Sequence, residues 1–303
     1  MEQINVFVLI DRFVKDQDVA ENSRKLYERN VKAFVRWVQA NNKNIDHLKK
    51  ADIIEYKQYL FNYSYSTLTI DNYLTSIRKF YQWLDSNGFY NNIVEGVRNP
   101  RKYKGYKKDP LTIEQVNTLL NSINRSILKG KRDFAIINLM LRTGLRTCEI
   151  TSLDIGDIEL NKTCYYLYVK RKGSQGNKTK MSITDKAFDA INDYLVERKD
   201  TDDIKPLFTV ISHNNTNQRI TTAGLSQLIK ERLKDAGIKT KKITAHSFRH
   251  TAAMNALKAG ASLHEVQLFL GHTSPNTTQL YIRAIEEERR LNNTPGKLLD
   301  DVY

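Results

Sequence analysis

The sequence predicts a mainly α-helical protein with one small β-sheet, divided into two domains. Apolar residues recur at three- and four-residue spacings along most of the chain, and the spacing changes once to a strand pattern. A basic stretch without apolar periodicity interrupts the chain near residue 100. With 303 residues, the chain is long enough for two domains that each bury a core.

The N-terminal domain, expected to span residues 1–97, reads as a bundle of four helices. Residues 66–84 place apolar side chains on one helical face, and residues 26–38 repeat this pattern. Two further helices are expected at about residues 4–15 and 51–62. Nothing in this part of the sequence suggests catalysis.

Residues 98–109 form the predicted boundary between the domains. The stretch RNPRKYKGYKK contains a proline, a glycine and two tyrosines but no acidic residue. One interpretation is a linker that lies along a DNA backbone, and the other is a solvated hinge. We favour DNA contact because neutralising phosphates supplies most non-specific affinity for DNA. The candidate DNA-binding residues are Arg101, Lys102, Lys104, Lys107 and Lys108.

The second domain, residues 110–303, is expected to be mostly helical with one β-hairpin. The segments CYYLYVKR and KTKMSIT are rich in strand-forming residues, and GSQGN between them supplies a turn with Gly173 and Gly176. Helices are expected at about residues 112–124, 131–143, 185–198, 221–236, 246–259, 262–270 and 275–289.

The positive charge is divided evenly between the two domains. The net charge is +14, with 19 basic and 12 acidic residues in 1–108 and 29 basic and 22 acidic residues in 109–303. Such a division suits a protein whose two domains both face a polyanion, although a generally basic soluble protein would also show it.

Composition and cysteine usage exclude several classes of protein. Hydrophobic residues make up 40% and charged residues 27%, which excludes a disordered or fibrous protein. The two cysteines, Cys148 and Cys164, lack the neighbours of a metal site, so structural zinc is not expected, and Cys148 is expected to be buried. The N-terminus lacks a signal-peptide pattern and no apolar run reaches membrane-spanning length, so the expected compartment is the cytoplasm.

Five short segments together predict chemistry on a DNA phosphate. Cleavage of a phosphodiester by a side-chain oxygen needs a nucleophile, cations for the non-bridging oxygens and a proton for the leaving oxygen. Alone, each arginine could be a surface ion pair and each of the 16 tyrosines a core aromatic. The candidates are Arg146 and Glu149 in TGLRTCEI, Lys172 in RKGSQGNK, His246 and Arg249 in HSFRH, His272 in LGHTSP and Tyr281 in TTQLYI.

In this order, the five segments resemble the tyrosine recombinase (phage integrase) family, in particular its short Xer-like members. The resemblance covers almost the whole chain and is strongest over residues 141–153 and 244–283. It implies an N-terminal helical core-binding domain of the SAM-like type and a mixed α/β catalytic domain that close on the DNA duplex as a clamp.

The resemblance also implies a role for each candidate. Tyr281 would be the nucleophile, and Arg146 and Arg249 would bind phosphate oxygens. Glu149 would orient Arg146 through a carboxylate bridge. His246 would accept or share the tyrosine proton, and His272 would donate a hydrogen bond to a non-bridging oxygen.

Lys172 is the residue that best matches the family's general acid, which protonates the leaving 5′ oxygen. Xer-like sequences usually read Gly-Lys-Gly-x-Lys here, whereas this chain has Lys170, Arg171, Lys172 and Gly173, followed by a longer turn to Lys178. Lys170 and Lys178 are therefore the alternatives.

The expected activity is site-specific recombination through a 3′-phosphotyrosine intermediate and a Holliday junction, without a metal or nucleotide cofactor. The resemblance implies a tetramer on double-stranded DNA with short inverted-repeat core sites, helped by the tail 286–303, in which Leu298, Leu299 and Val302 could supply apolar contacts to a neighbouring subunit. A second recombinase or an accessory protein could also take part. The alternatives are a nicking-closing enzyme of the type IB topoisomerase kind and a non-catalytic DNA-binding protein of the same fold. The sequence leaves open whether the task is dimer resolution, cointegrate resolution or integration and excision of a mobile element.

Overall fold

A computed structural model describes residues 5–101, 108–161, 164–171, 176–199, 202–211, 217–239 and 242–292. The chain divides into two compact units, residues 1–104 and 105–303, and each is described by itself.

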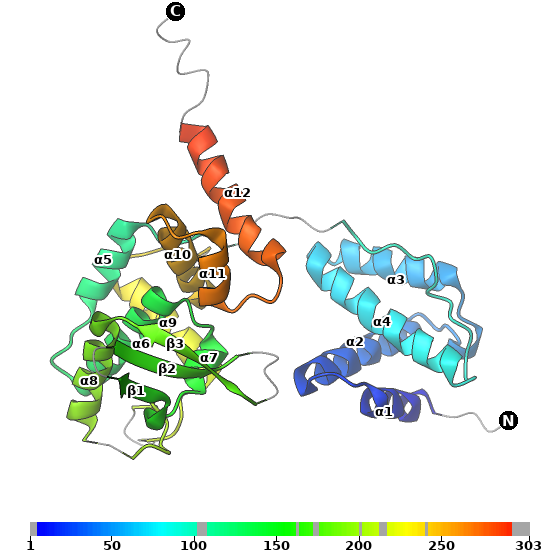
Figure 1. The fold of residues 1–303 in the computed structure, drawn as a ribbon. Helices are drawn as coiled ribbons and strands as arrows, with labels where there is room; N and C mark the ends of the chain where they lie inside the picture. Colours follow the sequence, from blue (N-terminus) through cyan, green and yellow to red (C-terminus); the bar gives the residue numbers. More distant parts are fainter. Residues whose placement is uncertain are drawn as a thin grey trace, which may run out of the picture. The chain divides into compact units, whose positions relative to one another are not determined.

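The first unit is a four-helix bundle, drawn from blue to cyan in Figure 1. Its aromatic core explains why the amphipathic segments fold together. Phe13 of the first helix meets Phe80 of the fourth edge to face with 5.3 Å between ring centroids, and Phe34 meets Tyr56 at 5.0 Å. The four predicted helices are confirmed: α1 (Val6–Asp16), α2 (Glu21–Ala40), α3 (Lys50–Asn62) and α4 (Thr67–Ser86).

The second unit is mostly helical and carries one three-stranded antiparallel sheet, as predicted for the fold class. The sheet has the order β1-β2-β3 and lies beside helix α8 (Figure 1). The helices are α5 (Ile113–Ser122), α6 (Leu128–Thr143), α7 (Thr147–Thr151), α8 (Asp185–Arg198), α9 (Thr222–Asp235), α10 (Ala245–Lys258), α11 (Leu263–Leu270) and α12 (Pro275–Asn292). The strands are β1 (Ile158–Asn161), β2 (Cys164–Lys170) and β3 (Lys178–Ile183).

The main core of this unit lies between the sheet and helices α6, α8 and α9. The side chains of Leu167 and Val169, on the inner face of β2, belong to this core and are fully buried. On the other face of the sheet, the Lys180 ammonium lies 4.2 Å from the centroid of the Tyr166 ring. The alternation of buried and exposed residues along β2 is the strand pattern that the sequence predicts.

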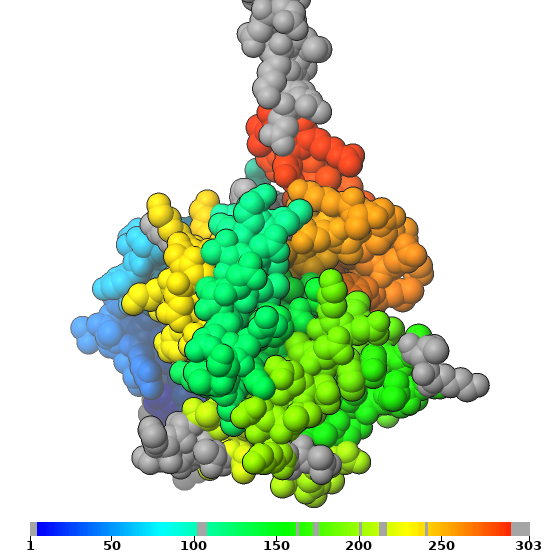
Figure 2. Space-filling view, turned by 90° about the vertical axis from the view of Figure 1, so that its left-hand side faces the viewer, coloured from blue at the N-terminus to red at the C-terminus, as the bar shows by residue number. Residues whose placement is uncertain are grey.

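A smaller apolar cluster forms where α12 packs on α10 and α11. In the space-filling view, α12 (red) lies against the orange surface of these helices (Figure 2). Tyr281 is one member of this cluster and is only 3% exposed. The cluster consists of Ala253, Met254, Val266, Leu270, Tyr281 and Ile285.

The structure corrects the sequence prediction at three places. The prediction missed β1, whose four residues are too few to display an alternating pattern, and it treated the short helix α7 as a turn. The prediction that Cys148 is buried is wrong: Cys148 is exposed because α7 turns Glu149 and Ile150 inward. None of the described helices is both long enough and apolar enough to span a bilayer.

Candidate active site

The turn between α6 and α7 presents Arg146. Helix α6 ends at Thr143 and is capped by Gly144, whose φ of 60° lies in the left-handed region. A Cβ at Gly144 would come within 2.6 Å of Leu270 Cδ2. Arg146 is the N-cap of α7: its backbone N–H donates to Glu149 Oε2 (2.8 Å) and its Nη1 donates to Glu149 Oε1 (2.7 Å). The Glu149 side chain is 1% exposed and that of Arg146 is 25% exposed, so a buried carboxylate orients a guanidinium that solvent still reaches.

Arg249, on α10, joins the ends of two other helices. Its Nη1 donates to the Gly144 carbonyl at the end of α6, and its Nη2 donates to the Leu270 carbonyl at the end of α11, both at 2.8 Å. The carbonyl end of a helix is electronegative and leaves acceptors without intrahelical partners, so a buried guanidinium fits there. Burial, followed by the positive charge of Arg146, lowers the pKa of Arg249 to about 10.

His246 and His250 lie on the same side of α10 as Arg249. The His246 and His250 rings are 5.8 Å apart, and the His250 ring is 5.5 Å from that of Tyr281. Packing against the protein, followed by the charge of Arg249, lowers the pKa of His246, although part of its ring is exposed. Burial lowers the pKa of His250 to about 4. Both imidazoles are therefore neutral near pH 7.

His272 is held by its backbone and by one ring nitrogen. Gly271, with φ 62°, ends α11, after which the His272 N–H donates to the Gln267 carbonyl at 3.0 Å. His272 Nδ1 lies 2.8 Å from the hydroxyl of the buried Thr278. This contact occupies Nδ1 and leaves Nε2 as the nitrogen that can meet a ligand. Burial, with the charge of Arg249 next, lowers the pKa of His272 to about 4.

Tyr281 lies on α12, one turn after Thr278. Burial raises the pKa of its phenol, whereas Arg249 and Arg146 lower it by their charge and Arg249 also by a hydrogen bond. The net shift is upward, so the phenol keeps its proton at neutral pH in this structure.

The described candidates thus come together from α7, α10, the end of α11 and α12. Arg146, His246, Arg249, His272 and Tyr281 are linked by ring contacts, hydrogen bonds and mutual electrostatic effects. Their geometry provides two forked cations, neutral imidazoles and a phenol around one site. This combination is suited to an attack on a phosphate.

The structure does not place the hairpin lysine. Lys172 lies outside the described residues. Of the two alternatives, Lys170 is exposed at the end of β2, and Lys178 is bound to the carboxylate of Asp157. Lys170 and Lys178 are opposite each other in the register of the hairpin.

The linker candidates are described only in part. Arg101 is exposed and Lys108 is half-buried. The other three, Lys102, Lys104 and Lys107, lie outside the described residues.

Two residues that the sequence did not point to also belong to the site. Thr278 holds the His272 ring, and nothing in TTQLYI distinguishes it from an ordinary helix threonine. Arg171 binds the end of α11 and lies 3.8 Å from Glu149. Its only signal in the sequence is that it occupies the place where Xer-like sequences usually have glycine.

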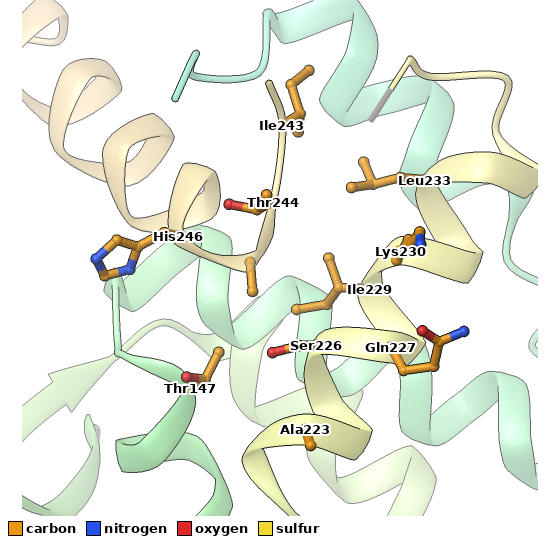
Figure 3. Close-up of a pocket in the computed structure, with 11 residues that line it drawn as sticks. Thr147, Ala223, Ser226, Gln227, Ile229, Lys230, Leu233, Ile243, Thr244 and His246 are labelled. Carbon is orange, nitrogen blue, oxygen red and sulfur yellow. The ribbon is translucent and has the colours of Figure 1, made fainter. Parts of the chain in front are cut away.

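A pocket of about 700 Å³ adjoins this site (Figure 3). The His246 ring lies at one side of the pocket and Thr147 below it, whereas Ile229 and Leu233 of α9 line the opposite wall. The walls come from α9, from the start of α7 and from Ile243 and Thr244, which precede α10. The pocket therefore opens next to the candidate catalytic groups.

Comparison with protein families finds matches over most of the chain. Residues 110–288 match the phage integrase family, and residues 10–88 match the N-terminal SAM-like domain of phage integrases. The chain belongs to the phage integrase family.

Several members of the family are similar to this chain along most of their length. Tyrosine recombinase XerD of Listeria monocytogenes is 28% identical over 276 residues, covering 88% of this chain and 90% of that protein. Tyrosine recombinase XerC of Herpetosiphon aurantiacus is 26% identical over 290 residues, covering 93% and 89%.

Solved structures of the family share the fold. The post-cleavage complex of XerH site-specific recombinase bound to a palindromic difH substrate has a TM-score of 0.78 at 18% identity, covering 96% of each chain. A lambda integrase dimer bound to a COC′ core site has a TM-score of 0.71 at 16% identity, covering 90% of this chain and 76% of that one.

Proposed function

We propose that this protein is a site-specific DNA recombinase that cleaves and religates DNA strands through Tyr281. The observation that carries the proposal is the position of the Tyr281 phenol, whose ring lies parallel to that of His272 with 6.3 Å between the centroids. The charges of Arg249 and Arg146 act to lower its pKa. A phenol beside guanidinium groups can attack a phosphodiester, because the guanidinium groups stabilise the negative charge that develops on the phosphate oxygens in the transition state.

The cleavage step exchanges one phosphodiester for another. The Tyr281 oxygen attacks phosphorus, the bond from phosphorus to O5′ breaks, and the electron pair leaves with O5′, which takes up a proton. The products are a 3′-phosphotyrosine and a free 5′ hydroxyl. Because the bond energy is kept in the phosphotyrosine, a 5′ hydroxyl from another strand can reverse the step and religate to a new partner through a Holliday junction.

The remaining groups serve charge and proton transfer. Arg146 and Arg249 bind the non-bridging oxygens through paired N–H groups, and His272 donates a hydrogen bond to one of them. His246 takes or shares the phenol proton, and the His250 ring, 5.8 Å from that of His246 and 5.5 Å from that of Tyr281, packs beside both. Lys172 protonates O5′ as general acid.

The two domains hold the DNA. Residues 1–97 and 110–303 form the binding and catalytic domains, and residues 98–109 follow the backbone between them through Arg101, Lys102, Lys104, Lys107 and Lys108. The substrate is double-stranded DNA with short inverted-repeat core sites in the cytoplasm. Four copies act together, with residues 286–303 contacting the neighbouring copy, and a second recombinase or an accessory protein can join them.

The test is covalent capture on suicide DNA substrates, nicked near the scissile phosphate and drawn from sequences that flank the gene, without added metal. Wild-type protein is expected to give a covalent protein–DNA band on a denaturing gel, and Tyr281→Phe none. Tyr194→Phe is the matched control, because Tyr194 is likewise buried in the same unit and its hydroxyl contacts that of Thr209 at 3.1 Å, outside the candidate site.

Each outcome of this test has a definite meaning. A band from Tyr281→Phe would refute the assignment of the nucleophile. Tight binding without a band from any variant, on every flanking site tried, would favour the non-catalytic DNA-binding alternative. Relaxation of supercoiled plasmids that lack the site would favour the nicking-closing alternative.

A further inference from the structure

Arg171, at the end of β2, binds the last turn of helix α11. Its Nη1 donates to the Leu270 carbonyl at 2.8 Å, and its Nη2 donates to the Phe269 carbonyl at 3.0 Å. Its side chain is 10% exposed. A strand and a helix that are about a hundred residues apart in sequence are thus joined by a partly buried guanidinium, which supplies donors for carbonyls that have no partner within the helix.

The same helix end is bound by the candidate active site. The Leu270 carbonyl accepts from Arg249 as well as from Arg171, each at 2.8 Å. The next residue, Gly271, lies so close to Arg171 that a Cβ there would come within 3.0 Å of the guanidinium. His272 follows directly. The Arg171 guanidinium is therefore packed against the turn from which His272 projects.

A second contact ties Arg171 to the other side of the site. Arg171 Nη1 is 3.8 Å from Glu149 Oε2, while Glu149 Oε1 accepts from Arg146. Burial is the main cause that lowers the pKa of Arg171, and the negative charge of Glu149 opposes this shift. Burying a guanidinium is costly unless it is paired, and here two backbone carbonyls and the Glu149 carboxylate offset that cost, an arrangement that a neutral side chain would not reproduce.

We propose that Arg171 is a positioning residue for strand cleavage, which clamps the end of α11 and thereby sets His272 against the scissile phosphate. The proposal rests on the proposed function for its catalytic consequence, but its structural part is independent of it.

The first experiment measures single-turnover cleavage of the suicide substrate and affinity for the uncleaved DNA. Arg171→Gln is expected to slow cleavage about a hundredfold, the cost of misplacing a reacting group by about 1 Å, with affinity unchanged. Arg171→Lys keeps the positive charge and an N–H donor, so it is expected to cleave faster than Arg171→Gln but more slowly than wild type. If Arg171→Gln does not fold, the rate of Arg171→Lys is measured in its place. Arg198→Gln is the control, because Arg198 also donates to two backbone carbonyls, those of Pro206 and Leu207.

A double-mutant cycle tests whether the effect passes through His272. In a His272→Ala background, Arg171→Gln is expected to change the cleavage rate by less than about twofold, because the group that it positions is gone. A full additional loss in this background, or Arg171→Gln cleaving as fast as Arg198→Gln, would overturn the proposal.

Hydrogen exchange separates this proposal from the proposed function. Amides of residues 263–278 are expected to exchange faster in Arg171→Gln than in wild type or in Arg198→Gln, whether or not the protein cleaves DNA. Unchanged exchange at these amides would refute the contact of Arg171 with α11 as a positioning element, even if cleavage is observed. A wild-type protein that never forms a covalent complex would instead refute the recombinase assignment, and the exchange data alone would then decide whether Arg171 holds the end of α11.

Discussion

The imidazole of His272 and the phenol ring of Tyr281 lie parallel, with 4° between their planes and 6.3 Å between their centroids. His272 belongs to the turn after α11 and Tyr281 to α12, so two segments fix this geometry together. A neutral imidazole at this separation can reach a phosphate oxygen while the phenol reaches the phosphorus of the same group. The relationship is therefore sensitive to anything that rotates the His272 ring.

Thr278→Val should rotate or loosen the His272 ring without emptying space in the core. Valine replaces the hydroxyl by a methyl group, so His272 Nδ1 loses its contact at 2.8 Å. We expect cleavage to slow about tenfold to a hundredfold, the effect seen when a hydrogen-bond partner that orients a functional histidine is removed. Stability should fall by about 1 kcal/mol, the usual value of one hydrogen bond. Thr278→Ser, which keeps the hydroxyl, is the control, and a Thr278→Val enzyme as fast as Thr278→Ser would contradict the role.

Glu149→Ala should destabilise the catalytic unit more than an ordinary surface substitution. The buried Glu149 carboxylate is the acceptor for Arg146 and lies 3.8 Å from Arg171, so its removal leaves these guanidinium groups facing each other. We expect a loss of about 3 kcal/mol in the free energy of unfolding, the order seen when one partner of a buried ion pair is removed.

The measurement for Glu149 is chemical denaturation followed by circular dichroism, because both tryptophans, Trp37 and Trp83, lie in the first unit and do not report on the second. Adding phosphate or DNA should recover part of the stability, since an anion then replaces the lost carboxylate. Equal stability of Glu149→Ala and wild type would show that the arginines do not need this counter-charge.

Local patterns explain why much of this structure could be predicted from sequence. The helices follow from apolar spacing, and the hairpin follows from CYYLYVKR and its glycine turn, because these signals lie within a few residues. Arg171 and Thr278 could not be found this way, since their partners are defined only when the chain is folded: α11 is about a hundred residues from Arg171. Cys148 shows the same limit, because a five-residue helix has too few turns to reveal which side faces the core.

His272 and His250 should make the protein less stable as the solution becomes mildly acidic. Burial is the main cause that lowers the pKa of each to about 4, whereas an unfolded histidine has a pKa of about 6.5. Between these values the unfolded chain binds protons that the folded protein does not, so stability present above pH ~6.5 is lost as the pH falls toward ~4. Each histidine contributes a slope of at most about 1.4 kcal/mol per pH unit.

Urea unfolding at a series of pH values tests this dependence. His272→Asn should reduce the loss of free energy of unfolding between pH ~6.5 and ~4 by the contribution of one histidine. His264→Asn, at an exposed position, is the control and should give the wild-type curve. A His272→Asn curve that is as steep as that of wild type would contradict the burial of a neutral imidazole.

Gly144→Ala should damage both stability and cleavage, because Gly144 serves the fold and the site at once. Its φ of 60° is unfavourable for alanine by about 1 kcal/mol, and its new Cβ would press on Leu270 Cδ2 at 2.6 Å, which adds an overpacking cost of about 1–3 kcal/mol. Its carbonyl also accepts from Arg249, so any shift of this turn moves a phosphate-binding guanidinium.

Gly237→Ala is the matched control, since Gly237 has a φ of 70° in the same unit and a Cβ there would meet nothing within 4 Å. Gly237→Ala should therefore show only the backbone cost and normal cleavage, and an equal effect of the two substitutions in thermal unfolding and in covalent capture would mean that the contact with Leu270 does not constrain the site.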